Sequence, residues 1–207
     1  MSRRTAAPLA AMTLMLAALA VAPAIAHDAA PPAASGTGVR ADMLIWINDA
    51  EDKLLQLAEA TPESVYSWRP SKDVRSVGEV FMHVAGANYG IGSFWGVAPP
   101  AGFNMETFDK SLTGKAAIMK GLKDSFAHME AGFAAVPDAD LDRKIEVFGG
   151  LLKTSVRGGY MLLLSHAHEH LGQSIAYARS NGIAPPWTAK QNAAFKAMQE
   201  KMKAGAK

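Results

Sequence analysis

The chain of 207 residues contains no cysteine. This absence excludes disulfide bonds, thiolate ligands for a metal ion and a lipid-modified cysteine behind an export signal. Hydrophobic residues make up 49% of the chain, which is enough to build one sizeable core. We therefore expect a single domain held together by apolar packing.

Long apolar runs are also scarce, and the one that stands out lies at residues 8–22, after Arg3 and Arg4. The run is followed by Ala24-Ile25-Ala26, a small-x-small pattern. A basic start, a short apolar run and small residues predict a cleavable signal peptide over residues 1–26, cut after Ala26. The run is too short for a transmembrane helix. We expect a periplasmic or secreted protein with no membrane segment after cleavage.

An excess of one charge is missing as well. The net charge of the whole chain is +2, and both extra positive charges come from Arg3 and Arg4. Residues 27–207 carry 19 basic and 19 acidic side chains. This balance argues against a nucleic-acid partner, which would require a basic surface.

Residues 27–39 are small and proline-rich, which predicts a flexible leader before a domain at residues 40–203. No strand pattern of useful length is present, although residues 145–148 are compatible with a short extended piece. Apolar residues at helical spacing indicate an all-α fold, a four-helix bundle with an extra C-terminal helix. The expected helices span about 40–60, 76–94, 113–135, 154–181 and 189–203.

Ser76 and Glu79 have the spacing of a capping box at the start of the second helix. The long connection at residues 95–112 contains aromatic side chains, and such connections are often functional. Trp95, Phe103 and Phe108 are candidates for the wall of a pocket, with core packing as the alternative.

Three of the six histidines lie between residues 166 and 170. His166 and His170 are four residues apart and share one face of a helix, whereas His168 points about 200° away and is expected to be exposed. Leu163 lies on the same side as the pair, so that side is expected to face inward. Buried imidazoles need partners. A hydrogen-bonded core pair and one half of a metal site explain the pattern about equally well.

A catalytic zinc ion usually has three protein ligands, so a metal site needs one more. His83 is the best candidate, because it lies mid-helix among Phe81 and Val84. His128 is expected to face solvent. The pattern is not that of a zinc protease, since Ala167 stands where that motif requires glutamate.

Several motifs together resemble the DinB family, in the DinB/YfiT-like superfamily of metalloenzymes. They are Trp68-Arg69-Pro70, Arg75-Ser76-Val77-Gly78-Glu79 with His83, His166-x-x-x-His170-Leu171-Gly172-Gln173, and Gly182-Ile183-Ala184-Pro185-Pro186. The resemblance implies a four-helix bundle in which His83, His166 and His170 bind a divalent metal ion, commonly nickel or zinc. It also implies a possible homodimer. Relatives include thiol-dependent transferases and isomerases.

The chain departs from the common family motif around the histidine pair, with Ala167 in place of glutamate, Glu169 at the fourth position and Leu171 in place of arginine. Gln173, Glu169 and Glu79 are candidates to orient ligands or a metal-bound water, although capping for Glu79 and plain exposure for Glu169 are the simpler readings. We expect a metal-dependent hydrolase or transferase acting on a small molecule. The alternatives are a non-catalytic periplasmic metal- or ligand-binding bundle and a purely structural bundle.

Overall fold

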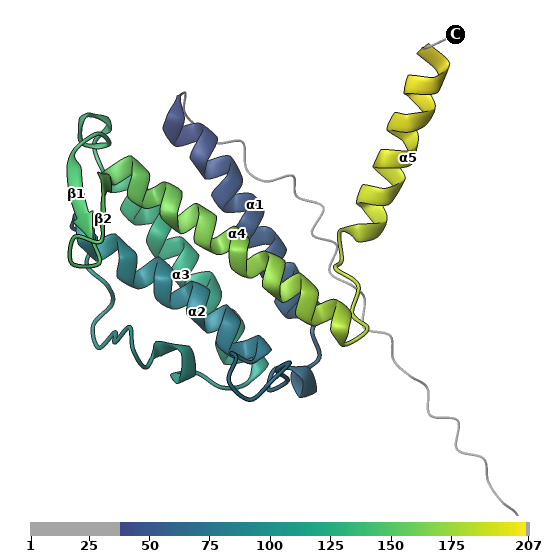
Figure 1. Cartoon of the computed structure of the whole chain (residues 1–207), viewed down its shortest axis with the longest axis horizontal. Helices are drawn as coiled ribbons and strands as arrows, with labels where there is room; N and C mark the ends of the chain where they lie inside the picture. Colours follow the sequence, from purple (N-terminus) through teal and green to yellow (C-terminus); the bar gives the residue numbers. More distant parts are fainter. Residues whose placement is uncertain (1–37, 206–207) are drawn as a thin grey trace, which may run out of the picture. The chain divides into compact units, whose positions relative to one another are not determined.

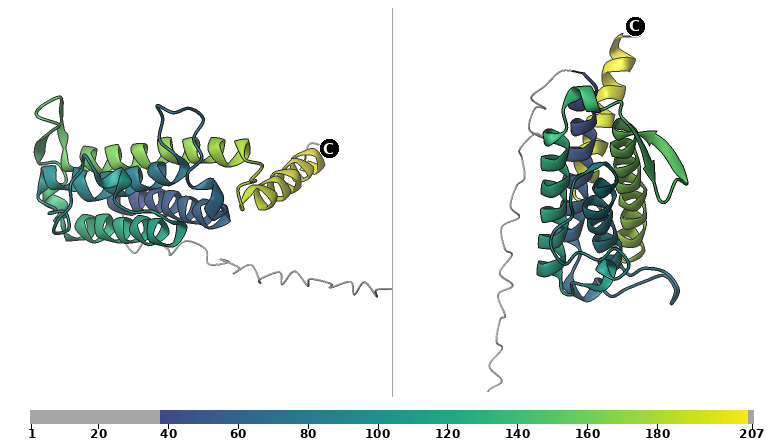
Figure 2. Two further views of the ribbon diagram at one scale, coloured as in Figure 1. Left: turned by 90° about the horizontal axis from the view of Figure 1, so that it is seen from below. Right: turned by 90° about the vertical axis from the view of Figure 1, so that its left-hand side faces the viewer.

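The computed structural model describes residues 38–205, and the expected signal peptide and nearly all of the leader lie outside them. Four long helices form the core of this part of the chain: α1 (Val39–Ala60), α2 (Val77–Gly90), α3 (Lys115–Ala135) and α4 (Val156–Ser180). Figures 1 and 2 show these helices side by side. The prediction of a helical bundle is confirmed. Within residues 38–205, no helix is long and apolar enough to span a membrane.

The helices are arranged as a ring, in which α1 packs against α3 and α4, and α2 packs against the same two. Their inward faces carry the apolar residues that the helical spacing predicted. Large side chains that are fully buried include Leu54, Phe81, Leu122, Phe126, Phe133, Tyr160 and Leu163. The ring brings α2 and α4 together as neighbours although α3 lies between them in the sequence.

The first turn of α2 is fixed by the predicted capping box. Ser76 accepts a hydrogen bond from the backbone N–H of Glu79, and the Glu79 carboxylate accepts one from the backbone N–H of Ser76 at 2.7 Å. Reciprocal bonds of this kind satisfy backbone donors that the helix leaves unpaired. The helix continues as a 3-10 turn, η2 (Ile91–Trp95).

A two-stranded antiparallel hairpin interrupts the helical pattern, with β1 at Lys144–Val147 and β2 at Leu152–Ser155. Figure 1 shows it at the end of the bundle where α4 begins. The extended piece expected near residue 145 is therefore a strand. The fourth helix begins at Val156, two residues after the expected start near Thr154, because residues 152–155 pair with β1 and Ser155 caps the helix.

The tail helix α5 (Thr188–Gly205) is present where the sequence predicted it. Its side chains from residue 189 to residue 204 are all exposed. An apolar stripe of Phe195, Met198 and Met202 lies on this helix among lysines. The stripe takes no part in the core of the bundle.

One half-buried acidic pair joins two helices of the ring. Glu51 on α1 lies beside Glu130 on α3. Burial, together with the charge of Glu130, raises the pKa of Glu51 to about 7. Glu51 therefore keeps its proton at mildly acidic pH.

Candidate metal centre

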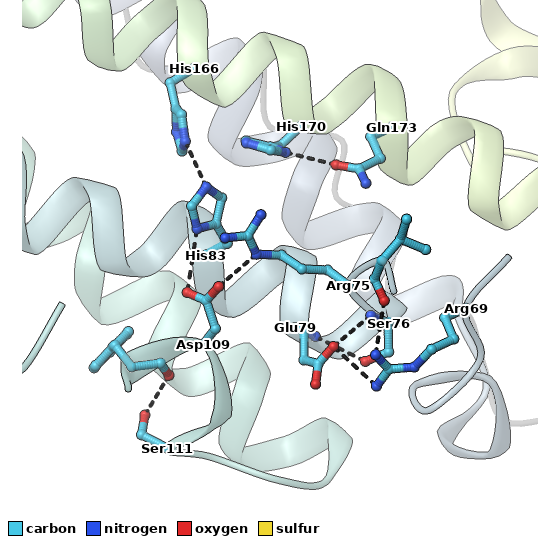
Figure 3. A network of polar contacts seen from close by, with 12 residues as sticks. Arg69, Arg75, Ser76, Glu79, His83, Asp109, Ser111, His166, His170 and Gln173 are labelled. Atoms are coloured by element: carbon cyan, nitrogen blue, oxygen red, sulfur yellow. Dashed lines mark hydrogen bonds and ion pairs between the residues drawn. The ribbon is translucent and has the colours of Figure 1, made fainter. Parts of the chain in front are cut away.

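Three histidines from two helices converge on one point between α2 and α4. They are His83 on α2 and His166 and His170 on α4, and one ring nitrogen of each lies within 4.8 Å of those of the others. The ring centroids form a nearly equilateral triangle with sides of 4.4, 4.7 and 4.9 Å. The structure thus brings together the three residues that the sequence singled out as ligands (Figure 3).

The nitrogen separations fit the geometry of a metal site. The Nε2 atoms of His83 and His166 are 3.2 Å apart. Metal–nitrogen bonds of about 2.0–2.1 Å in a tetrahedral zinc site place two ligand nitrogens about 3.3 Å apart. The separation between His83 and His166 therefore matches that of two ligands of one ion, and His170 offers a third nitrogen within 4.8 Å of both.

The Nδ1 atoms of His83 and His170, which point away from the centre, each contact an acceptor that holds the ring in place. His83 Nδ1 lies 3.3 Å from Asp109 Oδ1, and His170 Nδ1 lies 2.8 Å from Gln173 Oε1. Since both partners are acceptors, Nδ1 carries the proton and Nε2 keeps its lone pair. Gln173 is in turn oriented by donating to the Tyr177 hydroxyl at 2.9 Å. Contacts of this type fix the tautomer that a metal ion requires.

Burial keeps the α4 pair neutral. It lowers the pKa of His166 to about 4, and charges on His170 and His83 act in the same direction. Burial also lowers the pKa of His170, although the hydrogen bond with Gln173 opposes this shift. At neutral pH both imidazoles are therefore uncharged, which is the form that binds a metal ion.

Asp109 was not identified from the sequence, and it reaches the site from the connection between α2 and α3. It lies in the 3-10 turn η3 (Phe108–Lys110). Gly86 lets this turn approach α2, because a Cβ there would lie only 3.3 Å from the Phe108 ring. Gly86 is one helical turn beyond His83, so the packing of Phe108 places Asp109 beside that histidine.

Arg75 holds Asp109 in this position. Its Nε donates to Asp109 Oδ2 at 2.6 Å. Burial alone would raise the pKa of Asp109, but the hydrogen bonds from His83 and Arg75 outweigh it and lower the pKa. The carboxylate is therefore charged at neutral pH and can accept the Nδ1 proton of His83.

The remaining candidates lie apart from the centre. Glu79 caps α2 and pairs with Arg69 at 3.1 Å. Glu169 is exposed, and among residues 38–205 no hydrogen bond joins it to the three histidines. His168 Nε2 lies 4.0 Å from Asp49 Oδ2 on α1, and its Nδ1 lies 3.0 Å from Leu164 O, one turn earlier on its own helix. Its side chain is 36% exposed. It is half-buried rather than freely exposed, but it stays outside the cluster.

The expectation that His128 faces solvent is wrong. Its ring lies 5.2 Å from that of Tyr89 on α2, and its Nε2 is buried with no hydrogen-bond partner among residues 38–205. The reason is that Tyr89 and the connection after α2 cover this face of α3, with Phe103 and Phe108 packed on Tyr89. His128 is not part of the three-histidine cluster.

The aromatic residues of the connection serve packing. Trp95 is buried, and its indole N–H donates to the Tyr160 hydroxyl at 3.0 Å. A hollow of about 540 Å³ opens beside Asp109, between residues 63–69 and the starts of α2 and α3, and none of Trp95, Phe103 and Phe108 lines it. For these three residues the alternative of core packing fits the structure better than a pocket wall.

Comparison with known proteins gives a family and a fold. The sequence profile of the DinB superfamily matches residues 47–174, more than half of the chain. No curated protein matches the chain. A DinB-like protein from Bacillus cereus ATCC 10987 has a similar structure, with a TM-score of 0.61 and 18% sequence identity over 70% of this chain and 93% of that one.

A second solved structure, a DinB-like protein (YjoA) from Bacillus subtilis, is similar with a TM-score of 0.54. Its sequence is 20% identical, over 68% of this chain and 92% of that one. At such low identity these structures support the fold alone. The profile match and the helical bundle agree with each other: the chain belongs to the DinB superfamily.

Proposed function

We propose that this protein binds one divalent metal ion through His83, His166 and His170 and uses it as an exported hydrolase or transferase. The observation that carries the proposal is the convergence of three imidazole nitrogens within 4.8 Å, two of them on rings whose Nδ1 atoms face acceptors. Hydrogen bonding between the rings accounts for the pair of His83 and His166, whose Nε2 atoms lie 3.2 Å apart, but within residues 38–205 it leaves His170 Nε2 without a protein partner. The arrangement supports a ligand set over a set of satisfied core histidines.

The donor set supports nickel or zinc. Three neutral imidazoles suit these ions, and the absence of cysteine leaves no thiolate that would favour softer sites. Three protein ligands leave at least one coordination position for water or substrate. When bound, such an ion supplies Lewis acidity and lowers the pKa of a coordinated water.

The residues of this chain would hold and orient that group. Asp109 and Gln173 accept the Nδ1 protons of His83 and His170, so each ring presents Nε2. His83 is 26% exposed, which leaves one side of the centre accessible to a small molecule. Asp109 remains charged, because Arg75 holds it, and it fixes the tautomer of His83 that presents Nε2.

Metal analysis of the purified protein tests the first half of the proposal. The expected result is about one nickel or zinc ion per chain, lost in the His83→Ala variant. A chain that takes up neither ion, with an unchanged melting temperature when nickel or zinc is added, would contradict it. That outcome would favour the structural bundle.

Turnover separates an enzyme from a non-catalytic binder. Hydrolysis and thiol transfer are screened with metal-loaded protein and with the His170→Ala variant. Activity that disappears in the variant supports the enzyme. Full metal occupancy without activity in either protein supports the alternative, a periplasmic metal- or ligand-binding bundle.

Export and self-association complete the proposal. The basic, apolar and small-residue pattern of residues 1–26 supports a cleaved signal. Intact mass measurement of the periplasmic fraction should give a chain that begins at His27. Sedimentation of this mature chain distinguishes the proposed homodimer from a monomer.

A further inference from the structure

Arg75 is the positive charge that lies beside the three-histidine centre. One carboxylate separates it from His83, since Asp109 contacts Arg75 through Oδ2 and His83 through Oδ1. Figure 3 shows the Arg75 guanidinium beside Asp109 and His83.

The Arg75 guanidinium donates only some of its N–H groups to acceptors of the protein. Within residues 38–205 its one hydrogen bond runs from Nε, so both terminal nitrogens lack a protein acceptor. The side chain is 43% exposed, whereas Asp109 beneath it is 21% exposed. The neighbouring Arg69 differs, because it donates to Val74 O at 2.8 Å and pairs with Glu79. Arg75 alone of these two has a free edge near the centre.

The charge balance of a loaded site favours an anion at that edge. Three neutral imidazoles do not offset the charge of a divalent ion, and the single negative charge of Asp109 is offset by Arg75. The loaded centre would therefore keep two uncompensated positive charges in a partly buried place. A guanidinium edge presents parallel N–H donors that match the two oxygens of a carboxylate or phosphate.

We propose that the free edge of Arg75 binds an oxyanion group of the substrate next to the metal position, so that the substrate class is small anionic molecules. The inference rests on the proposed metal site and adds the substrate chemistry to it. Asp109 then has two roles, since it orients His83 and holds the Nε edge of Arg75, leaving the opposite edge free.

The test measures binding of simple oxyanions to cobalt(II)-loaded protein by the change in its visible absorption. Acetate and methyl phosphate are titrated separately, with uncharged acetamide as the third probe. We expect at least one oxyanion to bind, and the Arg75→Gln variant to bind it about 10-fold to 100-fold more weakly. Arg75→Lys should retain part of the affinity, because it keeps the charge but loses the planar fork.

Arg157→Gln is the matched control. Arg157 also pairs with an aspartate, Asp142, and is 39% exposed, but it lies on the first turn of α4 away from the histidines. It should bind the oxyanion as the wild type does. Cobalt affinity is measured for every variant first, so that loss of metal is not mistaken for loss of anion binding.

The outcomes separate the two proposals. A wild-type chain that takes up no metal overturns the proposed function, and the oxyanion site falls with it. Metal-loaded protein that binds oxyanions equally well with arginine, lysine or glutamine at position 75, or that binds acetamide as tightly as acetate, overturns the oxyanion site and leaves the metal site standing. Preference for acetate or for methyl phosphate identifies which oxyanion the site takes.

Discussion

The Nε2 atoms of His83 and His166 lie 3.2 Å apart, although 83 positions separate the two residues along the chain. This closeness exists because α2 and α4 are neighbours in the ring of helices. Any property of the centre therefore depends on both helices at once. It also means that histidines close in sequence, such as His168, need not share the site.

The first prediction contrasts His83 with His168. His83→Ala removes one of three ligands and should weaken nickel or zinc binding by about 100-fold or more, whereas His168→Ala should leave it unchanged. Metal retained after dialysis against a competing chelator measures the difference. Similar losses in both variants would contradict the assigned geometry.

A second prediction concerns the carboxylate that orients His83. Asp109→Ala removes the acceptor for Nδ1 and should weaken metal binding by about 10-fold to 100-fold. Asp109→Asn should have a smaller effect, because its amide oxygen can still accept the proton. Titration with a metal indicator gives the affinities.

The control for Asp109 is Asp142→Ala. Asp142 is also an aspartate paired with an arginine, but it is 73% exposed and lies in the turn before β1. Its removal should not change the metal affinity. If the two alanine variants bind metal equally well, Asp109 does not position His83.

The third prediction concerns pH and the acidic pair of α1 and α3. The pKa of Glu51 is raised from 4.5 to about 7 in the folded chain, so the folded state holds a proton that the unfolded state releases between these values. The stabilisation is complete below pH 4.5 and is lost as pH rises through about 7. Glu51→Gln should therefore raise the free energy of unfolding at pH 8, by an amount on the order of 2 kcal/mol, and change it little at pH 4.5.

Urea unfolding of metal-free protein at several pH values measures this effect. The difference between variant and wild type isolates Glu51 from the histidines, which titrate in both proteins. Asp42→Asn is the control, since Asp42 is an exposed acidic residue on the same helix that does not act on the pKa of Glu51. Parallel pH profiles for wild type and Glu51→Gln would show that Glu51 does not retain its proton.

The fourth prediction compares two glycines of α4. A Cβ at Gly159 would lie 2.5 Å from the buried Trp95 ring, whereas a Cβ at Gly172 would meet no atom within 4 Å. Gly159→Ala should destabilise the fold by about 1–3 kcal/mol through overpacking. Gly172→Ala should stabilise it by up to about 1 kcal/mol, because alanine favours a helix more than glycine does.

Thermal unfolding of the two variants shows whether each melting temperature falls or rises relative to the wild type. Metal content of Gly172→Ala should equal that of the wild type, since position 172 opens to solvent. Stabilisation by alanine at position 159 would mean that Trp95 is free to move away from α4.

Helical spacing was sufficient to predict the bundle and the pairing of His166 with His170, whereas the full set with His83 was implied by the resemblance to the DinB family. His166 and His170 share a face by the helical repeat, and His83 stood out because a histidine in an apolar stripe needs a partner. The hairpin escaped detection because strands of four residues are too short to show an alternating pattern. Its turn depends on Phe148, Gly149 and Gly150, all with positive φ.

Asp109 and His128 were missed for a different reason. Both depend on the path of the connection after α2, which has no periodic pattern to read. The only sequence feature that could have indicated the position of Asp109 is Gly86, because a glycine on a helix face allows an aromatic side chain to pack closely. The sequence alone does not show that this side chain is Phe108. Contacts made by irregular segments are set by tertiary packing and not by local propensity.

The origin of Asp109 has a consequence for how this centre changes over time. The three histidines are carried by helices whose inward faces also form the core, so few substitutions are tolerated there. Asp109 is carried by an irregular segment that is anchored to the bundle through Phe108, and irregular segments vary in sequence more readily than the helices they connect. Substitutions in the segment between α2 and α3 can therefore change the surroundings of the metal position, while the three histidines stay the same.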